Sequence, residues 1–109
     1  MAKIILRDSF LQTYKATTEY SFLNFGQLCV ERFDSSLKQT LHRLGKHPLS
    51  SPREPLLKSY FRPYRSTIIM KNWKIIYRYD ETYGRVILFD LWDMRMSDKR
   101  LLQQFKRKM

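Results

Sequence analysis

Apolar residues recur with a helical period along one clear segment of the chain, residues 28–44. They fall three or four positions apart and would line a single face of a helix. The members of this stripe are Val30, Phe33, Leu37, Leu41 and Leu44. Gly45 follows in the position of a helix C-cap, and Pro48 stands just beyond it. The pattern therefore predicts an amphipathic helix that ends at Gly45.

The segment before this helix predicts a short strand and another helix. Residues 2–8 form a short apolar run that is typical of a strand at or near a sheet edge. Asp8 or Ser9 can cap a helix of about three turns, with Phe10 and Tyr14 on its apolar side. The pattern is lost over residues 19–27, so we expect the first helix to end there and the second to start at Ser21 or Asn24.

Period-two patterns appear after a loop that holds all four prolines, residues 45–63. Because so long a connection is unusual without structure, we expect a short packed strand or turn within residues 53–61. Residues 64–72, 73–80 and 85–93 are rich in β-branched and aromatic residues and are separated by turn signals. They predict an antiparallel three-stranded meander, and Ser97 can cap a final short helix.

A tight turn at Lys71-Asn72 would join the first two of these strands. It would pair Met70 with Trp73 and Ser66 with Tyr77 on an apolar, aromatic face. Arg65, Thr67, Lys74 and Arg78 would then share the opposite, basic face, which we expect to be open. The predicted fold is α+β over a single domain, residues 1–109: an N-terminal strand, a two-helix hairpin, the meander with both helices on one sheet face, and a C-terminal helix.

The third strand of the meander is apolar on both faces, which is typical of a central strand and also of a bulged one. It carries Asp90 and Asp93 among its apolar residues. At a spacing of three, these carboxylates point to opposite faces and cannot share an acid–base site. We expect Asp90 to be a buried or half-buried hydrogen-bond acceptor for a tyrosine or an arginine, and Asp93 to be a partner for Arg95.

The net charge and its uneven distribution say more about possible partners than the rest of the composition does. The net charge is +11, and residues 45–109 hold 15 basic and 6 acidic residues against 6 and 4 in residues 1–44. This excess predicts a polyanionic partner, a nucleic acid or an acidic protein. Cys29 is the only cysteine and no Cys/His cluster has metal-ligand spacing, so we expect a cytoplasmic protein with no metal, no cofactor and no membrane span.

The order of the predicted elements, with "YRSTIIMKNWKIIYRYD" and "VILFDLWDMR", resembles the RelE/ParE superfamily of bacterial type II toxins. The resemblance covers nearly the whole chain and is strongest from Arg65 to Leu101. It implies a small basic toxin that a cognate antitoxin neutralises. RelE-like members cleave mRNA in the ribosomal decoding site, whereas ParE-like members inhibit DNA gyrase.

The resemblance also implies a set of site residues. The second-strand lysines of the family fall at Arg65 and Thr67, and its arginines on the third and last strands fall at Lys74 and Arg95. Arg65, Lys74 and Arg95 are thus the candidate catalytic cations. The tyrosine that RelE uses near its C-terminus falls at Leu101, which cannot transfer a proton, and an arginine is a poor base because it stays protonated.

Four more basic residues are candidates for nucleic-acid binding: Lys58, Arg62, Lys71 and Arg78. Three functions follow from these residues. Ribosome-dependent mRNA cleavage comes first because three of the four mapped cations survive. Gyrase inhibition comes close behind, and a non-enzymatic module that binds nucleic acid or an acidic protein is the third.

Overall fold

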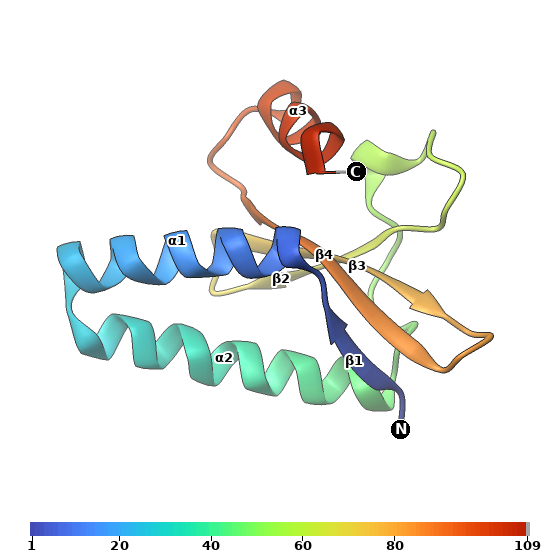
Figure 1. Ribbon diagram of the computed structural model, residues 1–109, viewed down its shortest axis with the longest axis horizontal. Helices are drawn as coiled ribbons and strands as arrows, with labels where there is room; N and C mark the ends of the chain where they lie inside the picture. The colour runs from blue at the N-terminus through green and yellow to red at the C-terminus, as the bar shows by residue number, and fades with distance from the viewer. Residues whose placement is uncertain (109) are drawn as a thin grey trace.

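The computed structural model describes residues 1–108 and has the α+β architecture that the sequence predicts (Figure 1). In chain order the elements are β1 (Lys3–Leu6), α1 (Asp8–Phe25), α2 (Gln27–Lys46), the short 3-10 helix η1 (Pro55–Leu57), β2 (Arg65–Ile69), β3 (Trp73–Asp80), β4 (Arg85–Asp93) and α3 (Asp98–Lys108). The long proline-bearing loop contains η1 and an isolated bridge between Arg53 and Arg65, as expected. Within residues 1–108 no helix is long and apolar enough to span a membrane.

The four strands form one sheet in the order β1-β4-β3-β2. β1 is an edge strand and runs parallel to β4, whereas the other neighbours are antiparallel. β4 is therefore an interior strand, which explains why both of its faces are apolar. Tyr77 pairs with Leu88 and Ile76 with Asp90, so β4 bulges at Phe89. Both readings of its unusual pattern are confirmed.

The α1–α2 hairpin is longer than the sequence predicts. α1 runs without interruption to Phe25, and Gly26, with φ of 86°, makes the turn into α2. The helix ends within residues 19–27 as predicted, but its 18 residues exceed the predicted three turns, and the predicted start of the second helix at Ser21 or Asn24 was wrong because α2 begins at Gln27. Apolar side chains on its last turns are largely exposed: Leu23 is 81% exposed and Phe25 66% exposed. An apolar helix end that is not buried against its own sheet has no periodic pattern to detect.

Gly45 lies inside α2 rather than at its C-cap, because the helix continues to Lys46. The Gly45 carbonyl accepts a hydrogen bond of 2.8 Å from the amide of Ala2. A Cβ at Gly45 would lie 3.2 Å from the side chain of Met1. The glycine therefore allows the N-terminus of the chain to pack closely against α2, and its prediction as a helix stop was wrong.

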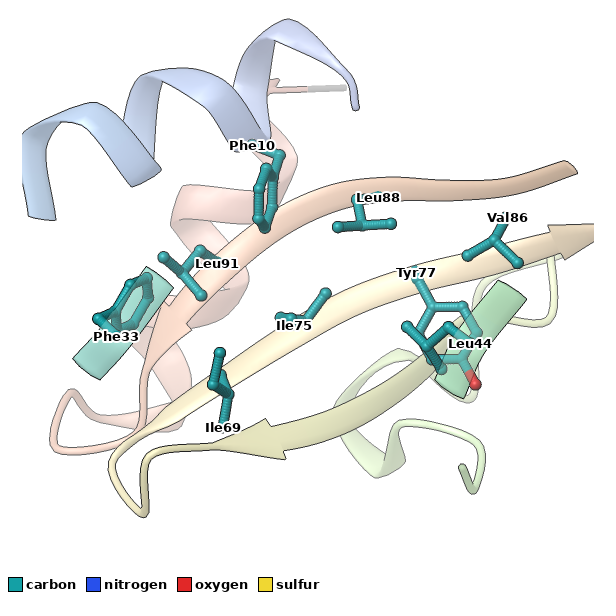
Figure 2. Close-up of a cluster of buried hydrophobic side chains, with 9 residues drawn as sticks. All are labelled: Phe10, Phe33, Leu44, Ile69, Ile75, Tyr77, Val86, Leu88 and Leu91. Atoms are coloured by element: carbon teal, nitrogen blue, oxygen red, sulfur yellow. The ribbon is translucent and has the colours of Figure 1, made fainter. Parts of the chain in front are cut away.

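The main core lies between the helical hairpin and one face of the sheet (Figure 2). Its buried members come from every layer: Phe10, Phe33, Leu44, Ile69, Ile75, Tyr77, Val86, Leu88 and Leu91. In Figure 2 the ring of Phe10 points from α1 toward the strand that carries Leu88 and Leu91. This face is the apolar face that the meander predicts, and both long helices cover it.

A second core occupies the opposite sheet face, which we predicted to be open. It is formed by Leu57, Tyr64, Ile76, Trp92, Leu101 and Phe105. α3 and the loop before β2 supply the cover, and the Ser97 hydroxyl accepts a 3.3 Å hydrogen bond from the amide of Arg100 in the first turn of α3. The expectation of an open face was wrong because the apolar stripe of α3 packs here.

Tyr14 joins α1 to α2 by donating a hydrogen bond to the carboxylate of Asp34. Partial burial, and secondly this hydrogen bond, raise the pKa of Tyr14 to about 12. The folded state thus favours the protonated hydroxyl. Its contribution to stability is complete below pH 10, the ordinary pKa of tyrosine, and is lost as the pH rises through about 12.

We therefore expect Tyr14→Phe to have a lower melting temperature than the unmodified chain at pH 8. The difference between the two melting temperatures should shrink as the pH rises from 10 to 12. Thermal melts of both proteins across this range measure the difference. Lysine titration cancels because it is common to both chains. A gap between the two melting temperatures that stays constant up to pH 12 would contradict the assignment.

Candidate functional site

Arg65 and Thr67 lie on the helix-covered face of the sheet, not on the face of Lys74. The β2–β3 turn spans residues 70–72, so Arg65 pairs with Tyr77 and Thr67 with Ile75. This register differs by one residue from the predicted one and reverses both faces of β2. Arg65 donates a 2.7 Å hydrogen bond to the carbonyl of Ser51, in the loop before β2. The predicted face of Arg65 and Thr67 was therefore wrong.

Lys74 lies on the face of the second core, which is the sheet face predicted for it, but it is not a free cation. Its ammonium nitrogen is 2.7 Å from a carboxylate oxygen of Glu54. Glu54 is only 2% exposed and also accepts from the hydroxyl of Ser66 and the amide of Leu56. The side chain of Lys74 keeps 19% of its exposure. Its position is thus fixed by a buried carboxylate that the sequence analysis did not consider.

Arg95 follows the end of β4 and is paired with Asp93, as predicted. The guanidinium donates two hydrogen bonds of 2.9 Å, one to each carboxylate oxygen of Asp93. It also lies over the ring of Trp73, 5.9 Å from the ring centroid. The hydrogen bonds to Arg95 hold the pKa of Asp93 below its usual range, and the same contact raises the pKa of Arg95. Arg95 is a permanent cation that can stabilise charge but not remove a proton.

These three candidate cations do not converge on one point. Lys74 pairs with Ile68, whereas Arg65 lies at the other end of β2 and on the other face. Arg95 borders an open cleft of about 610 Å³ between the helical hairpin and the ends of β3 and β4. The walls of this cleft include Tyr20, Phe25, Cys29, Asn72, Trp73 and Asp93. A reacting phosphate in this cleft would meet Arg95 alone of the three.

The four predicted nucleic-acid-binding residues have different surroundings. Lys58, Arg62 and Lys71 are exposed on loops and turns. Lys71 and Met70 have positive φ values of 70° and 53°, which non-glycine residues rarely adopt. Arg78 is half-buried on β3, and its guanidinium lies over the ring of Phe89, 5.8 Å from the centroid.

Arg7 and Arg107 were not predicted as site residues. The guanidinium of Arg7, at the corner between β1 and α1, lies over the same ring at 5.0 Å from the centroid. Arg107 of α3 lines a cleft of about 510 Å³ together with Arg7. No local motif marks these residues, because the cluster forms only when β1, β3 and α3 meet around the β4 bulge.

Asp90 is fully buried and accepts hydrogen bonds from several elements. Its two oxygens accept from the Trp92 indole at 3.1 Å, the Gln104 amide at 3.0 Å, the Leu91 backbone amide at 2.9 Å and the Thr13 hydroxyl at 3.3 Å. The prediction of a buried acceptor is confirmed, but these donors to Asp90 include neither a tyrosine nor an arginine. Asp93 lies opposite Trp73 on the other face, so the two carboxylates are separated as expected.

Similar folds occur among solved toxin structures. A chain of the chromosomal ParDE TA system from P. aeruginosa aligns with a TM-score of 0.66 over 85% of this chain and 96% of its own, at 8% identity. A metal-bound toxin from Helicobacter pylori gives 0.64 over 87% and 97%, at 17% identity. The isolated E. coli RelE toxin gives 0.58 over the full length of both chains, at 12% identity.

The chain has the RelE/ParE toxin fold. No protein-family model matches the sequence, and no curated protein sequence is significantly similar to it. At these identities the RelE/ParE fold fixes the arrangement of the elements and not the chemistry, since one fold hosts different activities. The function has to be argued from the site residues themselves.

Proposed function

We propose that the protein is the toxin of a type II toxin–antitoxin pair and that it inhibits translation by ribosome-dependent cleavage of mRNA. The RelE/ParE fold and a net charge of +11 support a target rich in phosphate. The observation that carries the proposal is Arg95. Its side chain is 64% exposed beside an open cleft and is held in a bidentate pair with Asp93.

The chain itself needs to supply only one catalytic group if the ribosome and the substrate supply the others. Attack of a 2′-hydroxyl on the adjacent phosphate needs a base, an acid for the leaving oxygen and a cation on the phosphorane. A guanidinium meets the third need well because it presents planar, permanently charged donors. Under this proposal Arg95 stabilises the phosphorane, and the ribosome and the substrate contribute the proton transfers.

Gyrase inhibition is the second candidate, and two observations favour it. Leu101, at the position of the RelE tyrosine, is buried in the second core and cannot reach a substrate. Arg65, Lys74 and Arg95 also lie apart, each with its own partner in the chain. Dispersed cations suit binding to a large target better than catalysis at one phosphate.

An antitoxin is the expected partner under either mechanism. Large apolar side chains are exposed around the turn of the helical hairpin: Tyr20, Phe22, Leu23, Phe25 and Leu28. Contiguous exposed apolar residues of this size are typical of protein interfaces. We propose that a cognate antitoxin covers the turn of the hairpin and neutralises the basic half of the chain.

Two assays on the purified protein separate the mechanisms. Primer extension on mRNA bound to programmed ribosomes detects cleavage, and a supercoiling assay detects gyrase inhibition. We expect cuts within the decoding site and unchanged supercoiling. Intact mRNA together with blocked supercoiling would make gyrase the target. A chain that is inactive in both assays and harmless on expression would be a binding module.

Arg95→Ala should abolish the growth arrest that follows induction of the protein without antitoxin. An exposed ion pair contributes little to stability, so the variant should still fold. Growth curves after induction measure the effect, with protein levels compared by immunoblotting. Arg32→Ala, which removes an exposed arginine from α2, is the matched control and should still arrest growth. Arrest by a stable Arg95→Ala protein would remove Arg95 from the site.

A further inference from the structure

The bulge of β4 brings an aromatic ring and two arginines together at the edge of the second core. Phe89 is half-buried, and its ring packs edge-on against Tyr64 with centroids 5.2 Å apart. The guanidinium groups of Arg7 and Arg78 lie over this ring at 5.0 Å and 5.8 Å from its centroid. Two cations, one from the corner between β1 and α1 and one from β3, are thus held beside one ring, where their mutual repulsion has to be offset.

No ion pair within residues 1–108 neutralises these arginines. The nearby carboxylate of Asp80 is already bound to Arg85 at 2.8 Å. The Nε of Arg78 is buried and has no acceptor in the described part of the chain, so contact with the ring accounts for the position of its guanidinium.

A third arginine extends this cluster along the surface. Arg107 of α3 and Arg7 line the cleft of about 510 Å³ at the start of α1. Asp8 lines this cleft too and is the only carboxylate among its lining residues. Even with Asp8 counted, the three arginines leave a local excess of positive charge.

We infer that Arg7 and Arg78, which lie over the Phe89 ring, and Arg107, which shares a cleft with Arg7, form a clamp for the phosphate backbone of single-stranded RNA. Guanidinium groups bind phosphates in a bidentate manner, and stacking on a ring limits the side-chain freedom that binding would otherwise cost. The inference rests on the proposed RNA target and adds a docking site that is separate from Arg95. Because phosphate contacts carry no sequence information, the clamp should hold RNA of any sequence.

Binding of a labelled single-stranded RNA to the purified chain tests the clamp. Fluorescence anisotropy with 12-nucleotide oligo(U) and oligo(A), over a series of NaCl concentrations, gives the affinity and its salt dependence. Arg7→Gln and Arg78→Gln should each weaken binding roughly threefold or more for both RNAs. Each should also reduce the slope of log affinity against log salt by about 0.7, the value for one lost phosphate contact on a single strand.

Arg32→Gln is the matched control, since it removes one positive charge from an exposed position on α2. Its slope should match that of the unmodified chain, and melting temperatures should show that all three variants fold. Phe89→Leu keeps the position apolar but removes the ring, and it should weaken RNA binding as well.

Equal losses in Arg7→Gln, Arg78→Gln and Arg32→Gln would refute the clamp, because binding would then depend on net charge alone. Unchanged RNA binding with weaker binding of polyglutamate would refute it in favour of an acidic protein partner. The ribosome assay keeps the two proposals distinct. If the chain cleaves mRNA but the Arg7 and Arg78 substitutions do not change its affinity for RNA, only the clamp is refuted. If those substitutions weaken RNA binding but the chain does not cleave mRNA, only the proposed reaction is refuted.

Discussion

Asp90→Ala is expected to lower the free energy of unfolding by about 3 kcal/mol or more, because it leaves buried donors without an acceptor. The indole N–H of Trp92 and the amide of Gln104 both donate to Asp90. Trp92 is itself fully buried, so its indole N–H is shielded from bulk water. The cost of a buried polar group that loses its partner exceeds the net gain of an ordinary hydrogen bond.

Urea denaturation of Asp90→Ala measures this loss, and Asp93→Ala is the matched control from the same strand. Asp93 pairs with Arg95 near the surface, so its removal should cost less than about 1 kcal/mol. Asp90→Asn keeps one acceptor oxygen and should fall between the two. If Asp90→Ala and Asp93→Ala were equally stable, the hydrogen-bond network around Trp92 would not matter to folding.

The hairpin between β2 and β3 shows what local sequence does and does not specify. The two strands are evident from their composition, and the faces of Lys74 and Arg78 on β3 are as predicted. The register of β2 is not, because a three-residue turn and a two-residue turn fit the same sequence. Met70 and Lys71 adopt positive φ although neither is a glycine or an asparagine. Because no glycine marks the positive-φ positions of the turn, its length is not specified, and one residue of register decides the face of Arg65.

The length of α1 and the covered second face of the sheet were both predicted wrongly, because both depend on tertiary contacts. Periodicity predicts a helix only where one side is buried against the rest of the chain. The last turns of α1 expose Leu23 and Phe25, so their helical pattern is invisible. Conversely, the sequence predicts a final helix, but nothing local indicates that Leu101 and Phe105 of this helix pack against Trp92. The cluster around Phe89 escaped prediction for the same reason.

Lys74→Met should destabilise the fold by about 3–5 kcal/mol, since it removes the cation that pairs with the buried Glu54. Glu54 would then remain as a buried carboxylate with hydrogen bonds but no counter-charge. Urea denaturation measures the loss. Lys71→Met, on the exposed turn, is the control for loss of a lysine and should change stability by no more than about 0.5 kcal/mol.

The double variant Glu54→Leu/Lys74→Met separates structure from function at this position. Replacing both members of a buried pair by apolar residues is often neutral, so much of the lost stability should return. A folded double variant that still cleaves mRNA would show that Lys74 serves the fold alone, held in place to neutralise Glu54. If cleavage disappears while the stability returns, Lys74 acts on the substrate, and Glu54 is the group that positions it. If the double variant were no more stable than Lys74→Met, the loss of stability could not be due to an unpaired Glu54.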